Sequence, residues 1–492
     1  MMGKQKKQDQ LFSYSVNLES RIPANHYLRP VKKVLDLSFV RAAVKDVYGY
    51  NGNESVDPEV IVKMLLLLFL DDISSERELM RMLPYRLDYL WFLDYGLDDA
   101  IPDHSVLSKA RKRWGLAVFQ QLFVESVGQC CEAGLVDGKK LFTDGSLVAA
   151  NASLDSVRKG SPELLQALRH AYQREEGKLE EREEGAPKGE DDSGGSGGGS
   201  GYDPTNEHLL CMTDPEAAMV RHGRMPARPR YKSHRAVDGE CGVIVAVETT
   251  SGDVAENRNL FALVDQAEAN TGIEVETVVG DCQYGTNDNF RECAERGIAS
   301  HLGDLSERDR KRDRGIFGPD KFIYVAEREV YVCPAGQDLK RRHHKPWRRA
   351  YYYGCAAKLC NACELKRQCT RSETGRTVLR YEGQELIDRA RAQSHSYAAK
   401  QDRWRRKHLS EGSFADAANN HGFKRARWRG LWRQRLQDYL IAVCQNLRTL
   451  IANGMGKDSG AVIQRIESRF RRLKVRFWVE FLGYGALRLG PA

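Results

Sequence analysis

The sequence predicts an α/β protein: a mixed sheet flanked by helices, preceded by an all-α N-terminal domain and interrupted by a small cysteine-rich insertion. Three observations predict this class. Apolar residues recur at three- and four-residue spacing through residues 30–135, which is typical of helices. Alternating segments rich in β-branched residues follow from residue 136 on, which is typical of strands. Five of the cysteines then gather between Cys333 and Cys369.

The N-terminal region is predicted to be a helical domain over residues 30–135, after a tail of residues 1–29. Its helical segments include DPEVIVKMLLLLFLDD at 57–72 and SERELMRMLPYRLDYLWFL at 75–93. Asp57-Pro58 and Asp103 resemble helix starts. Such a domain serves DNA binding or dimerisation equally well, and its pattern alone implies no chemistry.

The sheet is predicted within residues 136–303. Its segments follow the order β, β, β, α, β, α, β: KLFTDGSLVAAN, the two halves of RYKSHRAVDGECGVIVAVETTSGD, NRNLFALVDQAEANTG, VETVVGD, NDNFRECAERG and IASHLG. Residues 160–210 interrupt it with an acidic, helix-like run and the linker DDSGGSGGGSG, flexible by composition. A basic, cysteine-rich insertion at 304–400, C-terminal core helices at 401–452 and a basic tail at 453–492 complete the predicted domains.

The charge is mildly basic, and its distribution favours a polyanionic partner. The formal net charge is +8, and the surplus falls into cationic stretches at 340–349, 403–407, 424–435 and 464–475. Solvated helix faces explain any single stretch equally well. The polar start has no signal-peptide pattern, and the longest apolar run is too short to span a bilayer. We therefore expect a cytoplasmic protein with no membrane partner.

Two carboxylates lie at strand positions, where burial is costly unless the group is paired or binds a metal. Asp144 lies within the first predicted strand of the core, and Asp281 directly follows the fourth. Each has an ordinary alternative role in a turn or helix cap. Asp238 falls in a predicted hairpin turn, and His234 is most simply a buried core histidine.

Several motifs together resemble an insertion-sequence transposase of the DDE superfamily, in the branch with a helical N-terminal domain and a cysteine-bearing insert. They are TDGSLVAANAS, YKSHRAVD, VVGDCQYGT, CPAG with CNACELKRQC, and EGSFADAANNHGFKRARWRG. The resemblance implies a ribonuclease-H-like core in which the first and fourth strands are neighbours. It also implies that Asp144, Asp281 and Glu411 hold two Mg²⁺ (or Mn²⁺) ions for DNA cleavage and strand transfer.

Related transposases carry a tyrosine, an arginine and a lysine seven before, four before and seven after the third acid. Those positions are Trp404, Lys407 and Ala418 in this sequence. Lysine can contact a phosphate without the arginine fork, and tryptophan can stack on a base. Ala418 cannot bind an anion, although Lys424 can replace the lysine. The predicted DNA-binding residues are Trp404, Lys407, Lys424, Arg425, Arg427 and Arg429.

The partners that this resemblance implies are double-stranded DNA, both terminal inverted repeats and target DNA, and further copies of the chain. Joining two ends predicts a homodimer or a larger synaptic complex, associated with the bacterial nucleoid. The alternative is a catalytically impaired, transposase-derived DNA-binding protein, which the alanine at position 418 favours.

The clustered cysteines predict a structural zinc site. Cys333, Cys360, Cys363 and Cys369 combine a C-x-x-C unit with two flanking thiols, a set that suits tetrahedral zinc. Cys355 is a fifth candidate that can replace Cys333 or Cys369. The stretch is poor in aliphatic residues, so we expect a module too small to fold unaided. Free cysteines packed as small apolar groups are the alternative.

Overall fold

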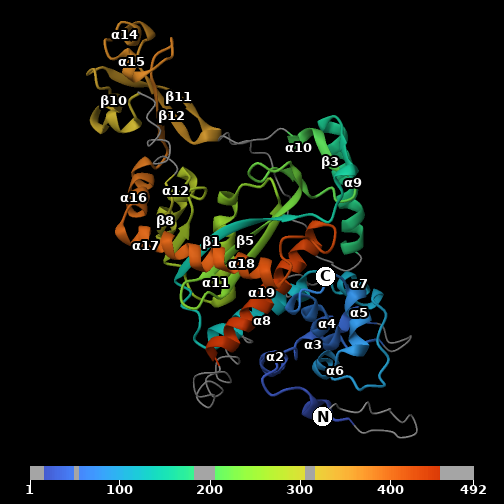
Figure 1. Ribbon diagram of the computed structural model, residues 1–492. Coiled ribbons are helices and arrows are strands. Elements are labelled where there is room, and N and C mark those ends of the chain that lie inside the picture. Colours follow the sequence, from blue (N-terminus) through green and yellow to red (C-terminus); the bar gives the residue numbers. More distant parts are fainter. Residues whose placement is uncertain (1–15, 49–54, 182–204, 305–315, 455–492) are drawn as a thin grey trace, which may run out of the picture. The chain divides into compact units, whose positions relative to one another are not determined.

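The computed structural model describes residues 16–48, 55–181, 205–304 and 316–454, which form two compact units (Figure 1). The first unit contains the described residues up to Ala133, Ala417–Phe423 and those from Tyr439 on; the second contains Gly134–Asp416 and Lys424–Asp438. The predicted linker at 191–201 lies outside the described residues, as do most of the N-terminal tail and nearly all of the C-terminal tail.

The first unit is helical, as predicted. Asp57 accepts a hydrogen bond from the Glu59 backbone, and Pro58 opens the buried helix α4. Gly115, at φ +66°, separates α7 from α8. The elements before residue 134 are α1 (Leu18–Arg21), α2 (Leu28–Val34), α3 (Val40–Val44), η1 (Lys45–Val47), α4 (Pro58–Leu70), α5 (Glu76–Met82), η2 (Leu83–Tyr85), α6 (Leu87–Leu93), α7 (Ser105–Trp114) and α8 (Ala117–Glu132).

The C-terminal part of the long helix α19 (Leu431–Gly454) also belongs to the first unit. The ring of Tyr439 stacks on Phe123 of α8, with 5.6 Å between the ring centroids. None of the helices in the described ranges combines the length and apolar composition that crossing a bilayer requires.

The second unit is built on a mixed sheet in the order β4-β5-β1-β7-β8, with β6 also paired to β5. The central strand β1 runs antiparallel to β5 and parallel to β7. The first and fourth strands of the predicted core, β1 and β7, are therefore neighbours. The strands are β1 (Lys140–Ala149), β4 (Ala218–Val220), β5 (Arg228–Asp238), β6 (Ile244–Ser251), β7 (Thr277–Gly280) and β8 (Ala299–Leu302).

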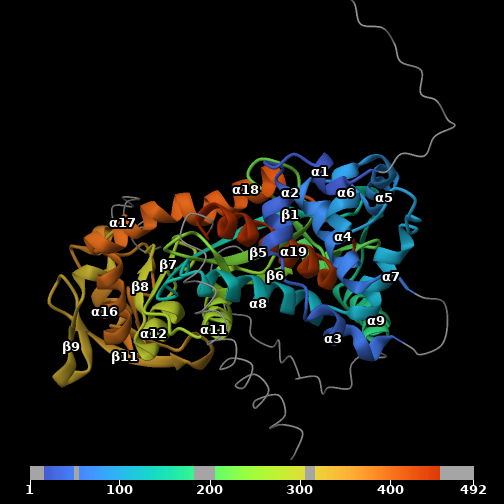
Figure 2. The same cartoon turned by 90° about the horizontal axis from the view of Figure 1, so that it is seen from below.

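Helices cover both faces of this sheet. Figure 2 shows α17 along one face, with α11 and α12 on the other. Gly272 and Gly297, the last residues of the two predicted helical segments, directly follow α11 and α12 as their C-caps. The elements of these layers are η4 (Glu256–Asn259), α11 (Leu260–Thr271), α12 (Asn287–Arg296), α16 (Gln384–Ser394), α17 (Tyr397–Arg406), the π-helix η8 (Lys407–Glu411) and α18 (Gly412–Asn420).

The described residues between β1 and β4, which are 150–181 and 205–217, form an excursion from the sheet. The acidic run predicted there is helical at its start, within α9. The elements of this excursion are η3 (Leu154–Ser156), β2 (Val157–Lys159), α9 (Pro162–Glu181), α10 (Thr205–His208) and β3 (Leu209–Cys211), and β2 pairs with β3.

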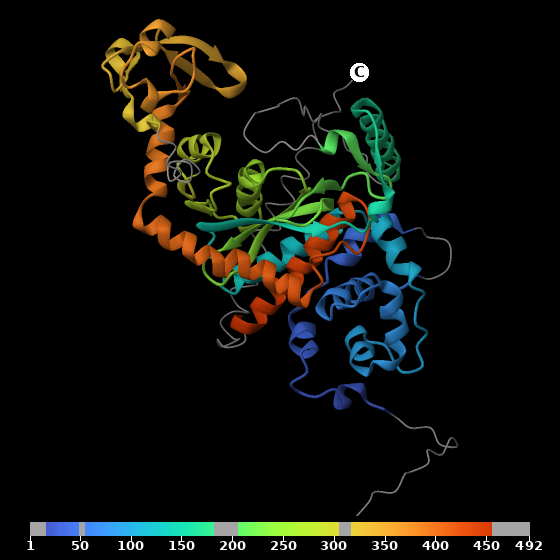
Figure 3. The same ribbon diagram turned by 45° about the horizontal axis from the view of Figure 1, so that its top comes forward.

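The cysteine-rich insertion forms a sheet of its own in the order β13-β12-β11-β10-β9 (Figure 3). Its core is mainly aromatic, with Phe322, Tyr331 and Tyr353 packed beside Leu339 and Val378. This core explains how a stretch poor in aliphatic residues packs. The elements are η5 (Pro319–Lys321), β9 (Ile323–Val325), η6 (Ala326–Arg328), β10 (Val330–Val332), β11 (Asp338–Lys345), η7 (Pro346–Arg348), β12 (Ala350–Gly354), α14 (Ala357–Asn361), α15 (Lys366–Cys369) and β13 (Thr377–Tyr381).

Candidate active site

Asp144 lies in the middle of the central strand β1, opposite Arg235 of β5. Its side chain is only 14% exposed. Burial raises the pKa of Asp144 to about 6, against the opposing effect of the Arg406 guanidinium. The charges of Asp281 and Glu411 add to this rise. Asp144 is thus a buried carboxylate with two acidic neighbours and one cationic neighbour.

Asp281 reaches this place because β7 runs parallel to β1. The register pairs Phe142 with Val279, and continuing it by two residues sets Asp281 beside Asp144. The Oδ1 atom of Asp281 accepts a hydrogen bond of 2.7 Å from the Gln283 backbone. Asp281 therefore caps the turn that follows β7. This bond uses one oxygen of its carboxylate and does not involve the other.

Glu411 ends the π-helix η8, which joins α17 to α18. Its carboxylate is linked to Asp144 through one guanidinium. Arg406 Nη1 lies 2.9 Å from Asp144 Oδ2, and Arg406 Nη2 lies 3.0 Å from Glu411 Oε1. Glu411 is 51% exposed, whereas Arg406 is 11% exposed. Arg406 thus joins two carboxylates from separate segments, and the charge of a third, Asp281, acts on Asp144.

The π-helix changes which side chain accompanies Glu411. Sequence spacing assigns Lys407, four residues before Glu411, to the place of the family's arginine. A π-helix winds with an i→i+5 pattern, so the residue five positions earlier lies on the glutamate's face. That residue is Arg406, which contacts Glu411, while Lys407 is exposed. Nothing in the residue spacing indicates that this turn contains an extra residue.

The basic segment that follows α18 is held against the far end of β1. Backbone hydrogen bonds join Ala149 to Lys424 and Ala426, and the Asn151 side chain bonds the Arg427 carbonyl. Lys424 Nζ donates to Ser146 Oγ at 2.9 Å, two residues from Asp144 and on the same face of the strand. Arg425 and Arg429 are exposed, and Arg427 is half-buried.

Two family models match the chain. A transposase domain (DUF772) matches residues 16–113, and a transposase DDE domain matches residues 332–451. The chain belongs to the insertion-sequence DDE transposases. No curated protein and no solved structure matches it. The DDE match contains Glu411 and Arg406 but neither Asp144 nor Asp281.

DDE transposases generally use Mg²⁺ or Mn²⁺, and the donor set of this transposase fits such ions in kind. Carboxylate oxygens are the ligands that hard divalent cations prefer, and Arg406 already places positive charge between two of them. Within the described ranges, however, no group of three or more acidic, histidine or cysteine side chains is arranged to hold a metal ion. In this structure Asp144 and Glu411 are instead spaced by the Arg406 guanidinium that lies between them.

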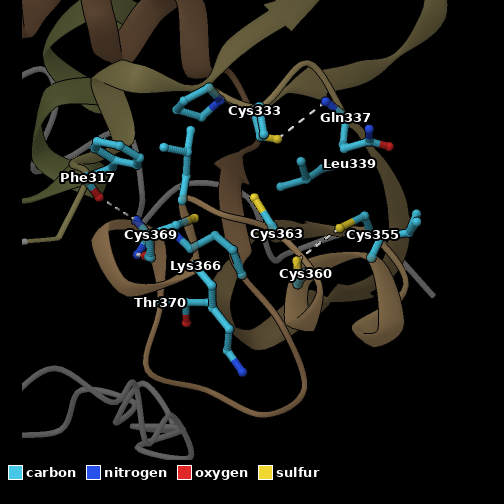
Figure 4. A pocket seen from close by; sticks show the side chains of 15 residues that line it. Phe317, Cys333, Gln337, Leu339, Cys355, Cys360, Cys363, Lys366, Cys369 and Thr370 are labelled. Atoms are coloured by element: carbon cyan, nitrogen blue, oxygen red, sulfur yellow. Dashed lines mark hydrogen bonds between the residues drawn. The ribbon is translucent and has the colours of Figure 1, made fainter.

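The five cysteines of the insertion line one pocket (Figure 4). Cys355 Sγ lies 3.1 Å from Cys360 Sγ, and burial, aided by Cys360, raises the pKa of Cys355 to about 12. Burial also raises the pKa of Cys369. The zinc site predicted at Cys333, Cys360, Cys363 and Cys369 is not supported, because the described thiols form no metal-holding group. Cys333 and Cys369 pack against the aromatic core, and Cys355 is buried.

The two structural assignments made from sequence are confirmed. Asp238 is buried and accepts hydrogen bonds of 2.8 Å from the backbones of Gly138 and Glu240. His234 is fully buried, and its Nε2 lies 3.0 Å from Thr250 Oγ1 and 3.2 Å from Asn259 Nδ2. Burial lowers the pKa of His234 to about 3, so the ring is neutral near pH 7.

The sequence patterns did not predict Arg406 or a further acid, Glu256, whose charge acts on the same carboxylates. Glu256 opens η4, after β6. Its charge interacts with those of both Asp144 and Asp281. Glu256 lies in a polar segment with no strand-like or helix-like periodicity that would single it out. Its place near the other acids is visible only in the folded chain.

Proposed function

We propose that this chain catalyses cation-dependent DNA cleavage and strand transfer at the terminal inverted repeats of an insertion sequence. One observation carries the proposal: Arg406 joins Asp144 of β1 to Glu411 of η8, with Asp281 beside them. The strand order β6-β5-β1-β7-β8 also supports a ribonuclease-H-like core. The match to the transposase DDE domain supports the same activity.

Asp144, Asp281 and Glu411 would hold the divalent cations, and Arg406 would withdraw from at least one carboxylate when they bind. Cations held there would supply activation of an attacking oxygen and stabilisation of the leaving oxygen at phosphorus. The chain's own residues position the DNA. Arg406, when released, and Lys424 at Ser146 present positive charge beside the acids, where the scissile phosphate must lie.

The exposed basic and aromatic residues near the site would bind the flanking DNA. Trp404 is 62% exposed, and Lys407 lies exposed at the start of η8. Arg425, Arg427 and Arg429 continue from Lys424 along the segment that is tied to β1. Since cleavage and joining involve two ends of one element, we propose that a dimer or a larger synaptic complex carries out the reaction.

The second candidate is a DNA-binding protein that has lost turnover. Ala418 favours it, because the family has a lysine at this spacing after the third acid. Lys424 counts against this second candidate, because its amine lies on the face of β1 that carries Asp144 and can replace the missing lysine. The two candidates differ in one measurable property, which is cleavage.

The test is cleavage of labelled DNA that carries the ends flanking the gene, with Mg²⁺ or Mn²⁺ and purified full-length protein. We expect Asp144→Asn, Asp281→Asn and Glu411→Gln each to abolish cleavage while DNA binding persists. Glu276→Gln is the matched control, since Glu276 is an exposed carboxylate just before β7 that pairs with Lys139. Cleavage that survives Asp281→Asn would contradict the assignment. Binding without cleavage by the wild type would favour the second candidate.

A further inference from the structure

Glu256 packs against the strand that carries Asp144. Its side chain is 12% exposed. A Cβ atom placed on Gly145 would lie 2.9 Å from the Glu256 carboxyl carbon. The Glu256 carboxylate therefore occupies the space that a side chain at position 145 would need, next to Asp144 in the chain.

Both cations and acids surround this buried carboxylate. Lys232 Nζ lies 3.8 Å from Glu256 Oε1 but donates its hydrogen bond to the Val254 carbonyl at 2.9 Å. The charge of Arg406 also favours the ionised form of Glu256. Burial raises the pKa of Glu256 to about 7, and the charges of Asp281 and Asp144 contribute to the rise. Burying an acid beside two other acids is unfavourable unless a cation joins them.

The edge of β1 at this point is open. β1 pairs with β7 from Lys140 to Phe142, and its next described bridge on a parallel segment joins Ala149 to Arg425. Asp144 and Gly145 point to opposite faces of the strand. Because Gly145 has no side chain and β7 has ended, carboxylates from the two faces can approach one another around this edge.

We propose that Glu256 supplies a fourth carboxylate to the divalent-cation site of Asp144, Asp281 and Glu411. The inference rests on the proposed function, since it takes that site as given. Lys232 offsets the Glu256 charge when the cation is absent, as Arg406 does for Asp144 and Glu411. A fourth oxygen donor suits a hard cation, which takes six or more ligands.

The test is the affinity for Mn²⁺ of the full-length protein, measured by isothermal titration calorimetry without DNA. We expect Glu256→Gln to weaken Mn²⁺ binding by roughly 10- to 100-fold, the usual loss when a group supporting a metal is removed. Glu256→Asp should recover part of the loss. Gly145→Ala, whose added methyl displaces Glu256, should weaken binding similarly. Glu276→Gln should leave the affinity unchanged.

Asp281→Asn distinguishes a failure of the fourth ligand from a failure of the proposed active site. If Asp281→Asn weakens Mn²⁺ binding and Glu256→Gln does not, the fourth ligand is wrong while the proposed active site stands. If neither substitution changes the affinity, the proposed active site itself is wrong. Circular dichroism spectra matching the wild type are the condition for comparing each variant, and Gly145→Ala provides a second route if Glu256→Gln does not fold.

Discussion

Arg406 Nη1 lies 2.9 Å from the carboxylate of Asp144, although one residue belongs to a helix and the other to the central strand. The second nitrogen of the same guanidinium reaches Glu411 at 3.0 Å. Without a bound cation, this arginine is the positive charge that allows the two acids to lie together, one of them buried.

Arg406→Gln should lower the stability of the cation-free protein and increase its response to Mn²⁺. Removing the guanidinium leaves Asp144 and Glu411 without their shared partner, which we expect to cost about 1–3 kcal/mol. Because a divalent cation would then replace the missing charge, the rise in melting temperature on adding MnCl₂ should exceed that of the wild type. The control is Arg405→Gln, whose guanidinium bonds a backbone carbonyl of Gly239. An equal rise in both variants would contradict the role given to Arg406.

Lys424→Ala should weaken binding to duplex DNA and flatten its dependence on salt. Each phosphate contact contributes about one unit to the slope of log Kd against log salt concentration. Fluorescence anisotropy between low and moderate salt measures this slope. Lys139→Ala is the matched control, because Lys139 pairs with Glu276 beyond the start of β1, away from Ser146. The same slope for Lys424→Ala and the wild type would exclude a phosphate contact.

Trp404→Ala should weaken DNA binding without lowering the melting temperature. The side chain is 62% exposed, and its ring contacts His408, one turn along the helix, at 4.9 Å between centroids. Loss of a base-stacking contact costs about 1–3 kcal/mol, which corresponds to a Kd that rises roughly 5- to 150-fold. A melting temperature that falls while DNA affinity is kept would instead indicate a packing role.

His234 should make the second unit less stable in mild acid. Its pKa in the folded chain is lowered to about 3 by burial, so the unfolded chain takes up a proton below its own pKa of about 6.5 and the folded chain does not. Stability is therefore full above that value and is lost as pH falls toward 3, by about 2 kcal/mol at pH 5. Urea denaturation at pH 7 and pH 5 measures the difference.

His234→Gln is the comparison for that experiment. Glutamine does not titrate, so the variant should lose less stability between pH 7 and pH 5, even if it is weaker at both. An unchanged pH dependence would show that other groups are responsible.

Local patterns in the sequence were enough for most of the fold. Periodicity placed the N-terminal helices and the strands of the sheet, and glycines marked the ends of α11 and α12. Asp144 and Asp281 stood out because a carboxylate at a strand position is unusual. Their proximity needed only the parallel pairing of β1 with β7, which the family resemblance already implied.

The tertiary structure decided what lies around those acids. Residue spacing predicted that Lys407 takes the place of the family's arginine beside Glu411. The π-helical turn contains one more residue than an α-helical turn, and this places Arg406 on the face of Glu411 instead. The cysteine spacing predicted a zinc site, whereas in the folded chain Cys333 and Cys369 pack against the aromatic core of the insertion.

The sequence by itself determined the class, the order of helices and strands, and two of the acids, because these depend on periodicity and chain-local capping. Only the folded chain decided that Arg406 joins Asp144 to Glu411 and that Glu256 packs against Gly145. The physical reason is that contacts between distant side chains depend on strand register, helix winding and the space left by a missing side chain. Strand register, helix winding and the space at a glycine cannot be deduced from the spacing of residues along one segment.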